Sequence, residues 1–207
     1  MAPVALGFRA LKGGSVVVGV AVDGDVPRII VSTFLATAIE GDRLSFEPYH
    51  VAAEMARGAH GGASTQAAAA VAEGRKRQDA LAAAGLEDIV DRLRSEGHEP
   101  SIAALLVNRA GWISDLLEYS LAFADHPPVA EGLAVRDALR FACGEARIPV
   151  AEMDEKSLPA RASELLSLSP ADIDARLKAL GAAAGKPWRK EQKLACLAAW
   201  IAIMAPR

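Results

Sequence analysis

Three runs of β-branched and apolar residues at the start of the chain constrain its fold most strongly. They cover residues 4–10, 15–22 and 28–37, and short glycine-containing segments at 12–14 and 23–25 separate them. Because turns of this kind join neighbouring antiparallel strands, the pattern predicts a three-stranded meander. The near-continuous apolar character of 16–20 and 29–35 indicates strands that are covered on both faces, as in a sheet between layers of helices.

After the meander, helical and strand patterns alternate. Short apolar runs at 101–108 and 148–152 are expected to be two further strands, each following a helix. Helices are expected from His50 and over 86–95, 112–123 and 129–145. A further segment at 157–168 precedes two more helices, which start at Pro170 and Pro187. The predicted architecture is an α/β fold with a mixed five-stranded sheet, in which three antiparallel strands come first and helix-linked strands follow.

The chain of 207 residues suits one hydrophobic core, so we expect residues 1–207 to form a single domain. The Gly- and Ala-rich segment at 58–84 is expected to be mobile and to run into an Ala-rich helix. No internal repeat interrupts this order.

Overall charge and composition exclude several classes of function. The formal charge of −3 provides no general attraction to nucleic acid or membrane, so such binding would need a local patch. The longest apolar run, 194–205, is shorter than the ~20 residues that cross a bilayer, and no export signal is present. Cys143 and Cys196 lack metal or disulfide spacing and are expected to be buried in a reducing, cytoplasmic protein. The four histidines show no metal-binding spacing, and no P-loop, GxGxxG or GxSxG motif occurs.

The order of the elements resembles the ribonuclease H-like superfamily, in particular its Holliday-junction-resolvase branch. In that branch a Gly-hydrophobic-Asp segment on the first strand precedes a glycine turn, and Gly7-Phe8-Arg9 and Gly13-Gly14 occupy this place. The segment from Val129 through Arg136 to 148–150 also looks like the long helix and short strand of that branch. The resemblance implies nucleic acid as a partner.

The resemblance also implies a metal site that this chain departs from. Nucleases of the superfamily hold two divalent metals with carboxylates from the first strand, the fourth strand and the final helix. Here Arg9 replaces the first-strand Asp, Asn108 and Arg109 end the fourth strand, and only Glu191 remains in the last helix. Because two metals ~4 Å apart need several converging carboxylates, we expect a degenerate site without a metal cofactor. The alternative is a magnesium-dependent nuclease with a rearranged carboxylate set, drawn from Glu40, Glu118, Glu152 and Glu191.

Positive side chains gather at the start of the last helix. Cations there face the positive end of the helix dipole, which costs ~0.3–1 kcal/mol per charge, so another interaction could favour them. One interpretation is a phosphate-binding site, and the other is a solvated helix face. If the first strand and last helix are neighbours, a basic cleft results. Its expected phosphate-binding residues are Arg9, Lys12, Asn108, Arg109, Lys186, Arg189, Lys190 and Lys193.

Three functions remain open from the sequence. The leading one is a non-catalytic protein that binds nucleic acid or another phosphate-bearing partner, and the second is the metal-dependent nuclease. The third is a homodimeric scaffold, which the apolar end of the last helix at 200–204 favours. Trp112 and Trp200 are interpreted as packing residues, and Trp188 as the residue that anchors the start of the last helix. Glu131 and Arg136 are interpreted as part of a surface ion-pair ladder, with a cleft-facing arrangement as the alternative.

Overall fold

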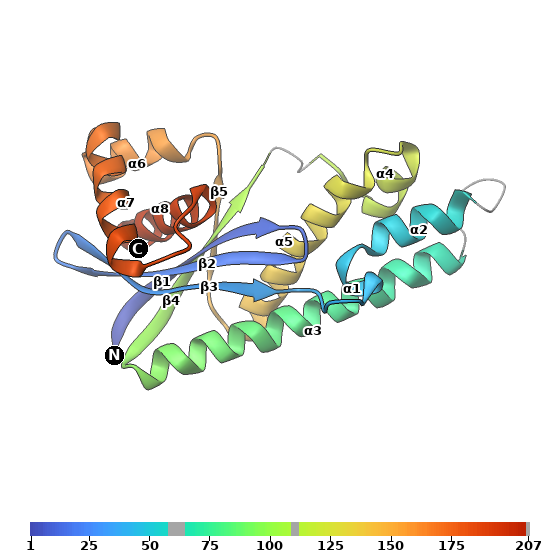
Figure 1. Cartoon of the computed structure of the whole chain (residues 1–207), viewed down its shortest axis with the longest axis horizontal. Coiled ribbons are helices and arrows are strands. Elements are labelled where there is room, and N and C mark those ends of the chain that lie inside the picture. Colours follow the sequence, from blue (N-terminus) through green and yellow to red (C-terminus); the bar gives the residue numbers. More distant parts are fainter. Residues whose placement is uncertain (58–64, 109–111, 206–207) are drawn as a thin grey trace.

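A single five-stranded sheet organises the computed structural model, which describes residues 1–57, 65–108 and 112–205 (Figure 1). The strand order is β3-β2-β1-β4-β5. Strands β1 (Ala2–Leu11), β2 (Gly14–Asp23) and β3 (Val26–Ala36) form the antiparallel meander. Strand β4 (His98–Val107) runs parallel to β1, and β5 (Val150–Asp154) runs parallel to β4. The predicted mixed sheet is therefore confirmed.

The helices fall into groups that cover different parts of this sheet (Figure 1). Helices α3 and α5 pack on one face, α6, α7 and α8 pack on the other, and α1, α2 and α4 lie beyond the sheet against α3 and α5. Their bounds are α1 Arg43–Phe46, α2 Pro48–Arg57, α3 Thr65–Ser95, α4 Leu116–Ala122, α5 Pro127–Glu145, α6 Leu158–Leu166, α7 Pro170–Ala184 and α8 Lys190–Met204.

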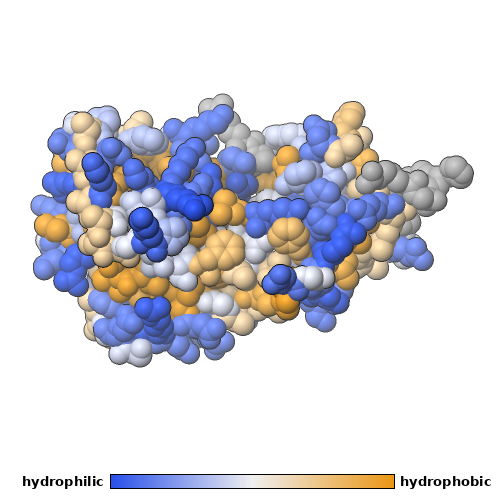
Figure 2. All heavy atoms as spheres, viewed as in Figure 1, coloured by the Kyte–Doolittle hydropathy of each residue, from blue (hydrophilic) through white to orange (hydrophobic). Residues whose placement is uncertain are grey.

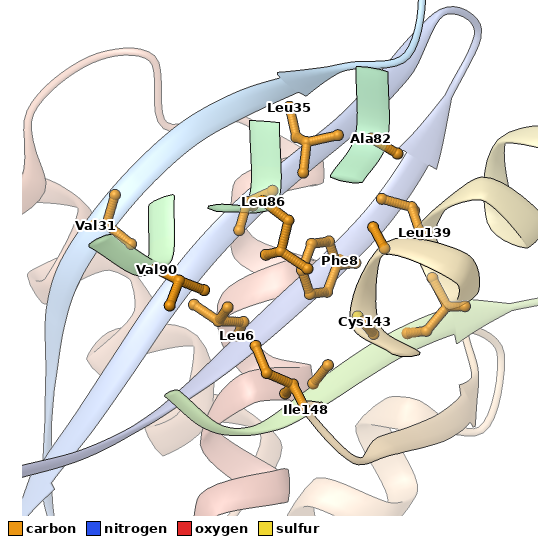
Figure 3. Packing of buried hydrophobic residues seen from close by; sticks show 14 of the residues in the cluster. Leu6, Phe8, Val31, Leu35, Ala82, Leu86, Val90, Leu139, Cys143 and Ile148 are labelled. Atoms are coloured by element: carbon orange, nitrogen blue, oxygen red, sulfur yellow. The ribbon is translucent and has the colours of Figure 1, made fainter. Parts of the chain in front are cut away.

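Alternating residues of the strands feed two separate cores. Leu6 and Phe8 point toward α3 and α5, where they pack against Leu86 and Leu139 (Figure 3). Ala5, the residue before Leu6, faces α8 instead. Both faces of β2 are buried, as expected for 16–20, whereas β3 leaves Ser32 and Phe34 exposed, so the same expectation for 29–35 is wrong. The exposed part of the sheet lies mainly at β3, where hydrophobic residues gather at the left of the view (Figure 2).

Helix α3 differs from the expectation for residues 58–84. Residues 65–84 are helical and continue without a break to Ser95, so this part of the expected mobile segment is wrong. Residues 58–64 lie outside the described residues. Alanine is the strongest helix former, and Ala67 and Val71 bury one side of the helix against Tyr49 and Ala52. Gly74 suits this close packing, because a Cβ atom there would clash with the carbonyl oxygen of Leu44.

Helix α8 lies directly on β1. A Cβ atom at Gly7 would overlap the backbone carbonyl of Ala195, so only glycine permits this approach. The helix begins at Lys190, three residues after the expected start at Pro187. Its apolar end packs into the core, with Trp200 and Ile201 fully buried, which removes the support that this segment gave to the homodimer interpretation. Within the described ranges, no helix combines the length and apolar character needed to cross a membrane.

Candidate anion-binding site

The place of the first-strand carboxylate in the nuclease pattern is occupied by the guanidinium of Arg9. Its Nε and Nη2 atoms donate to Glu155 Oε2 and Oε1, each at 3.2 Å, and its Nη1 atom lies 3.7 Å from Glu191 Oε1. Glu155 follows β5, where its N–H donates to the carbonyl of Val107 at 3.0 Å. One cation from β1 thus joins carboxylates from the end of β5 and the first turn of α8.

The close contact between β1 and α8 sets this arrangement. Arg9 is two residues beyond Gly7 and therefore shares its face of the strand. Glu191 is one helical turn before Ala195, the residue that packs on Gly7. The side chain of Arg9 is only 18% exposed, so its charge needs these partners.

The carboxylates of the alternative nuclease set do not come together. Glu40 follows β3 at one edge of the sheet, whereas Glu152 lies on β5 at the other edge and accepts from Arg140 Nε at 2.6 Å. Glu118 lies in the first turn of α4. Among the described residues, no group of three or more His, Cys, Asp or Glu side chains could hold a metal ion. The residues present do not fit a pair of divalent metals, because a guanidinium lies between Glu155 and Glu191.

A cleft of about 570 Å³ lies at the carboxyl ends of β4 and β5. In open α/β sheets, this end of parallel strands is where ligands commonly bind. Arg75 of α3 and Arg136 and Arg140 of α5 line it, and we call it the arginine cleft. Its other lining residues are Tyr49, Val71, Val107, Asn108, Ile113, Ser114, Asp115, Leu116, Leu117, Leu133, Asp137 and Glu152.

Two of the three arginines in the cleft pair with carboxylates, and the third does not. Asp137 accepts from Arg75 at 2.8 Å and from Arg140 at 2.7 Å, and Arg140 also binds Glu152. Arg136 makes no ion pair with any described residue, and its Nη1 donates to Asn108 Oδ1 at 2.9 Å. The Nε atom of Arg136 is buried without a hydrogen-bond acceptor. The group of arginines therefore has room to accept an anion.

The electrostatic environment of Arg136 supports the same view. Burial lowers the pKa of this guanidinium, and the charges of Arg140 and Arg9 lower it further, against the opposing effect of Glu155. Burial is the largest cause of this lowering of the pKa, and the neighbouring positive charges add to it. Beside it, burial raises the pKa of Tyr49 to about 12, so its hydroxyl stays protonated at neutral pH. An anion bound in the arginine cleft would offset these positive charges. It would have both the neutral hydroxyl of Tyr49 and charged guanidinium groups as hydrogen-bond donors.

The expected phosphate-binding residues fall in different places. Asn108 lines the arginine cleft, Arg9 does not line it and acts on Arg136 only electrostatically, and Arg109 lies outside the described residues. Lys12 instead pairs with Glu47 at 3.1 Å and lies over the ring of Phe46. Lys193 pairs with Asp174 at 3.5 Å near the start of α8, where Lys186, Arg189 and Lys190 are exposed.

Arg75 and Arg140 are not among the phosphate-binding residues predicted from the sequence, and a cleft-facing Arg136 was only an alternative interpretation. The i, i+4 spacing of Arg136 and Arg140 was the available signal, but it fits a surface ladder equally well. The paired residue of that alternative, Glu131, is fully buried and has a different role. Its Oε1 accepts from the backbone N–H groups of Tyr49 at 2.8 Å and His50 at 3.0 Å, so it caps the start of α2.

A group of aromatic side chains gathers where the chain leads into α4 and α5, close in sequence to the cleft-lining residues 113–117. Trp112 is 72% exposed, so its interpretation as a packing residue is wrong; it lies before α4 begins and reaches no core. Its ring meets the edge of Tyr119, which stacks on His126 with 3.9 Å between centroids. Phe123, 66% exposed, completes the group. Trp200, in contrast, is buried, and Trp188 Nε1 anchors the start of α8 by donating to Leu177 O.

Comparison with known proteins finds the same fold. No family model and no curated protein matches the sequence. Among solved structures, Thermus thermophilus RuvC matches with a TM-score of 0.55 and 12% identity, covering 97% of this chain and 93% of that one. The T. thermophilus RuvC in complex with Holliday junction substrate gives the same score and identity, with 97% and 92% covered. At this identity the likeness concerns the fold, and it agrees with the strand order and the helical layers: the chain has the ribonuclease H-like fold of the RuvC-type resolvases.

Proposed function

We propose that this protein is a non-catalytic member of the ribonuclease H-like fold that binds phosphate-bearing partners, nucleic acid in particular. The observation that carries the proposal is the position of Arg9 between Glu155 and Glu191. A guanidinium at this point repels a divalent metal and neutralises the carboxylates that would hold it. Metal-dependent hydrolysis then has no basis, whereas recognition of phosphate does not need a metal.

The arginine cleft is the proposed binding surface. It supplies three guanidiniums, of which Arg136 makes no ion pair with any described residue; of its three carboxylates, Asp137 and Glu152 pair with the other arginines and Asp115 caps α4. Guanidinium groups match phosphate oxygens in geometry. Trp112, next in sequence to the lining residue Ile113, and Phe123 expose rings that suit stacking on unpaired bases, which favours nucleic acid over inorganic phosphate. One structurally similar protein is described with a Holliday junction substrate, so branched DNA belongs among the ligands to test.

The basic residues of α8 are the competing surface. Lys190 and Lys193 are at least partly exposed and could bind phosphate independently of the cleft. The proposal further takes residues 1–207 as one domain. Cys143 and Cys196 are free and buried, which fits a reducing compartment such as the cytoplasm.

The experiment measures binding of single-stranded, duplex and branched DNA over a salt series. Arg136→Gln and Arg75→Gln each remove one candidate phosphate contact, so each should reduce the salt slope for duplex DNA by about one unit, whatever the base sequence. Lys190→Glu/Lys193→Glu tests the competing surface. Arg92→Gln is the matched control, because Arg92 is an exposed arginine of α3 that pairs only with Glu96 among the described residues.

The outcomes distinguish between the arginine cleft, the α8 surface and an absence of DNA binding. If the cleft variants lower the slope and the α8 variant does not, the arginine cleft binds the partner. The reverse result transfers binding to α8. If the natural protein fails to bind all three DNAs at low salt, the nucleic-acid proposal is wrong.

A further inference from the structure

A second pocket, of about 480 Å³, lies between α6, α7 and α8 on the face of the sheet opposite α3 and α5. Its floor is apolar and comes from Ile173 and Leu177 of α7 and Leu194 and Leu197 of α8. A volume of this size falls within the range of ~300–1,000 Å³ that is typical of small-molecule sites. The pocket plays no part in the function proposed above.

One wall of the pocket is held in place before any ligand arrives. The indole of Trp188 donates from Nε1 to the carbonyl of Leu177 at 3.0 Å. A Cβ atom at Gly181 would overlap the same indole, so the ring is pressed closely against the backbone of α7. A flat aromatic surface fixed beside an apolar floor is a preformed site for an aliphatic chain or a ring.

The rim of the pocket carries an excess of positive charge. Arg189, Lys190 and Lys193 lie on it with only one carboxylate, Asp174, which is 3.5 Å from Lys193 Nζ. Lys190 has no ion pair among the residues that the structure describes. The rim would therefore attract an anionic group, while the floor excludes a fully hydrated one.

We infer that this pocket binds a small amphipathic anion, with its carboxylate or phosphate on the rim of Arg189, Lys190 and Lys193 and its apolar part on the floor beside Trp188. The head group and the apolar part of the ligand can be tested separately. The head group must be negative, and affinity must grow with the apolar part until the floor is covered. Burying one methylene strengthens binding about fourfold.

The test titrates the full-length protein with hexanoate, octanoate and decanoate below micelle formation, using calorimetry and the indole N–H signals in NMR spectra. Decyl phosphate tests the other head group, and decanol and acetate supply the tail and the head alone. Trp188→Phe identifies the Trp188 signal. We expect one site, a shift of the Trp188 signal and not of Trp112, and an increase in affinity of about fourfold per methylene along the alkanoate series. Decanol and acetate should each bind at least about tenfold more weakly than decanoate.

Lys190→Glu/Lys193→Glu should weaken decanoate binding at least about tenfold and leave decanol unchanged, whereas Arg92→Glu, on α3, should change neither. Decanoate binding no tighter than decanol, an affinity independent of chain length, or an unshifted Trp188 signal would overturn the inference. A decanoate affinity that saturating duplex DNA leaves unchanged separates this site from the arginine cleft, so either proposal can fail without the other.

Discussion

Arg9 and Glu155 join the middle of the sheet to its last strand through two parallel hydrogen bonds of 3.2 Å. Such paired contacts between a guanidinium and a carboxylate are directional as well as electrostatic. With Glu191 at 3.7 Å, the same guanidinium also reaches the first turn of α8. One cation of β1 thus holds two carboxylates that come from the end of β5 and from α8.

Replacing Arg9 should destabilise the fold more than replacing a comparable surface arginine. Arg9→Gln leaves Glu155 and Glu191 partly buried without their cation, and we expect a loss of ~1–3 kcal/mol. Arg94 is the matched control, because it binds Glu99 with the same paired geometry but is far more exposed. Arg94→Gln should cost less than ~1 kcal/mol. Urea unfolding of both variants at neutral pH makes the comparison, and equal losses would mean that burial of the Arg9 pair contributes nothing.

Two tryptophans should respond oppositely to truncation. Trp200 is 1% exposed inside the core formed by α8 and the sheet, so Trp200→Ala should cost ~3–5 kcal/mol. Trp112→Ala should change the free energy of unfolding by no more than ~0.5 kcal/mol, since that ring is largely in solvent. Thermal and urea unfolding test both. A Trp200→Ala protein with unchanged stability but altered oligomeric state would place Trp200 at a subunit interface.

Glu131 should give the stability of the protein a distinct dependence on pH. Burial raises its pKa from 4.5 to about 7, against the lowering effect of the backbone N–H groups of His50 and Tyr49. Because the folded state holds this proton more tightly than the unfolded state, the contribution is full below about pH 4.5 and is lost as pH rises toward 7. His50 Nδ1 lies 3.3 Å from the carboxylate, and Lys12 and Glu47 also act on it electrostatically.

The variant Glu131→Gln tests this dependence, because the amide keeps an acceptor for the start of α2 but does not titrate in this range. Urea unfolding of both proteins at pH 4.5, 6 and 7.5 gives the difference between them. The natural protein should lose stability relative to the variant as pH rises, by about 1.4 kcal/mol per unit of pKa shift at most. If the stabilities of the two proteins change with pH in parallel, Glu131 has the same pKa in the folded and unfolded states, which contradicts the prediction.

The sequence predicted the sheet more successfully than the site, for a physical reason. Strands β1 to β3 are rich in apolar and β-branched residues and are divided by glycine turns, and Gly13 and Gly24 indeed adopt positive φ angles of 77° and 58°. That signal is local. Whether Arg136 faces solvent or a cleft depends on where α3, α4 and β5 lie. The spacing of residues along α5 does not contain that information.

The same distinction explains the errors. Lys12 was grouped with Arg9 because the first strand was expected beside the last helix, but Lys12 pairs with Glu47 instead. Residues 65–84 carry two glycine-free alanine runs and a basic group, and tertiary contacts to α2 stabilise them as a helix. The replacement of the first-strand carboxylate by Arg9 was visible in the sequence; its partner Glu155 was not, because it lies 146 residues away.

Calorimetry with Mg²⁺ and Mn²⁺ tests most directly the claim that Arg9 replaces the metal ions. The natural protein should give no heat of stoichiometric binding, and it should not cleave branched or single-stranded DNA in the presence of either metal. Arg9→Asp is the informative variant, because it would add a third carboxylate to Glu155 and Glu191 and should acquire measurable Mn²⁺ binding. Stoichiometric binding of Mg²⁺ by the natural protein at micromolar affinity, with magnesium-dependent cleavage, would contradict the account.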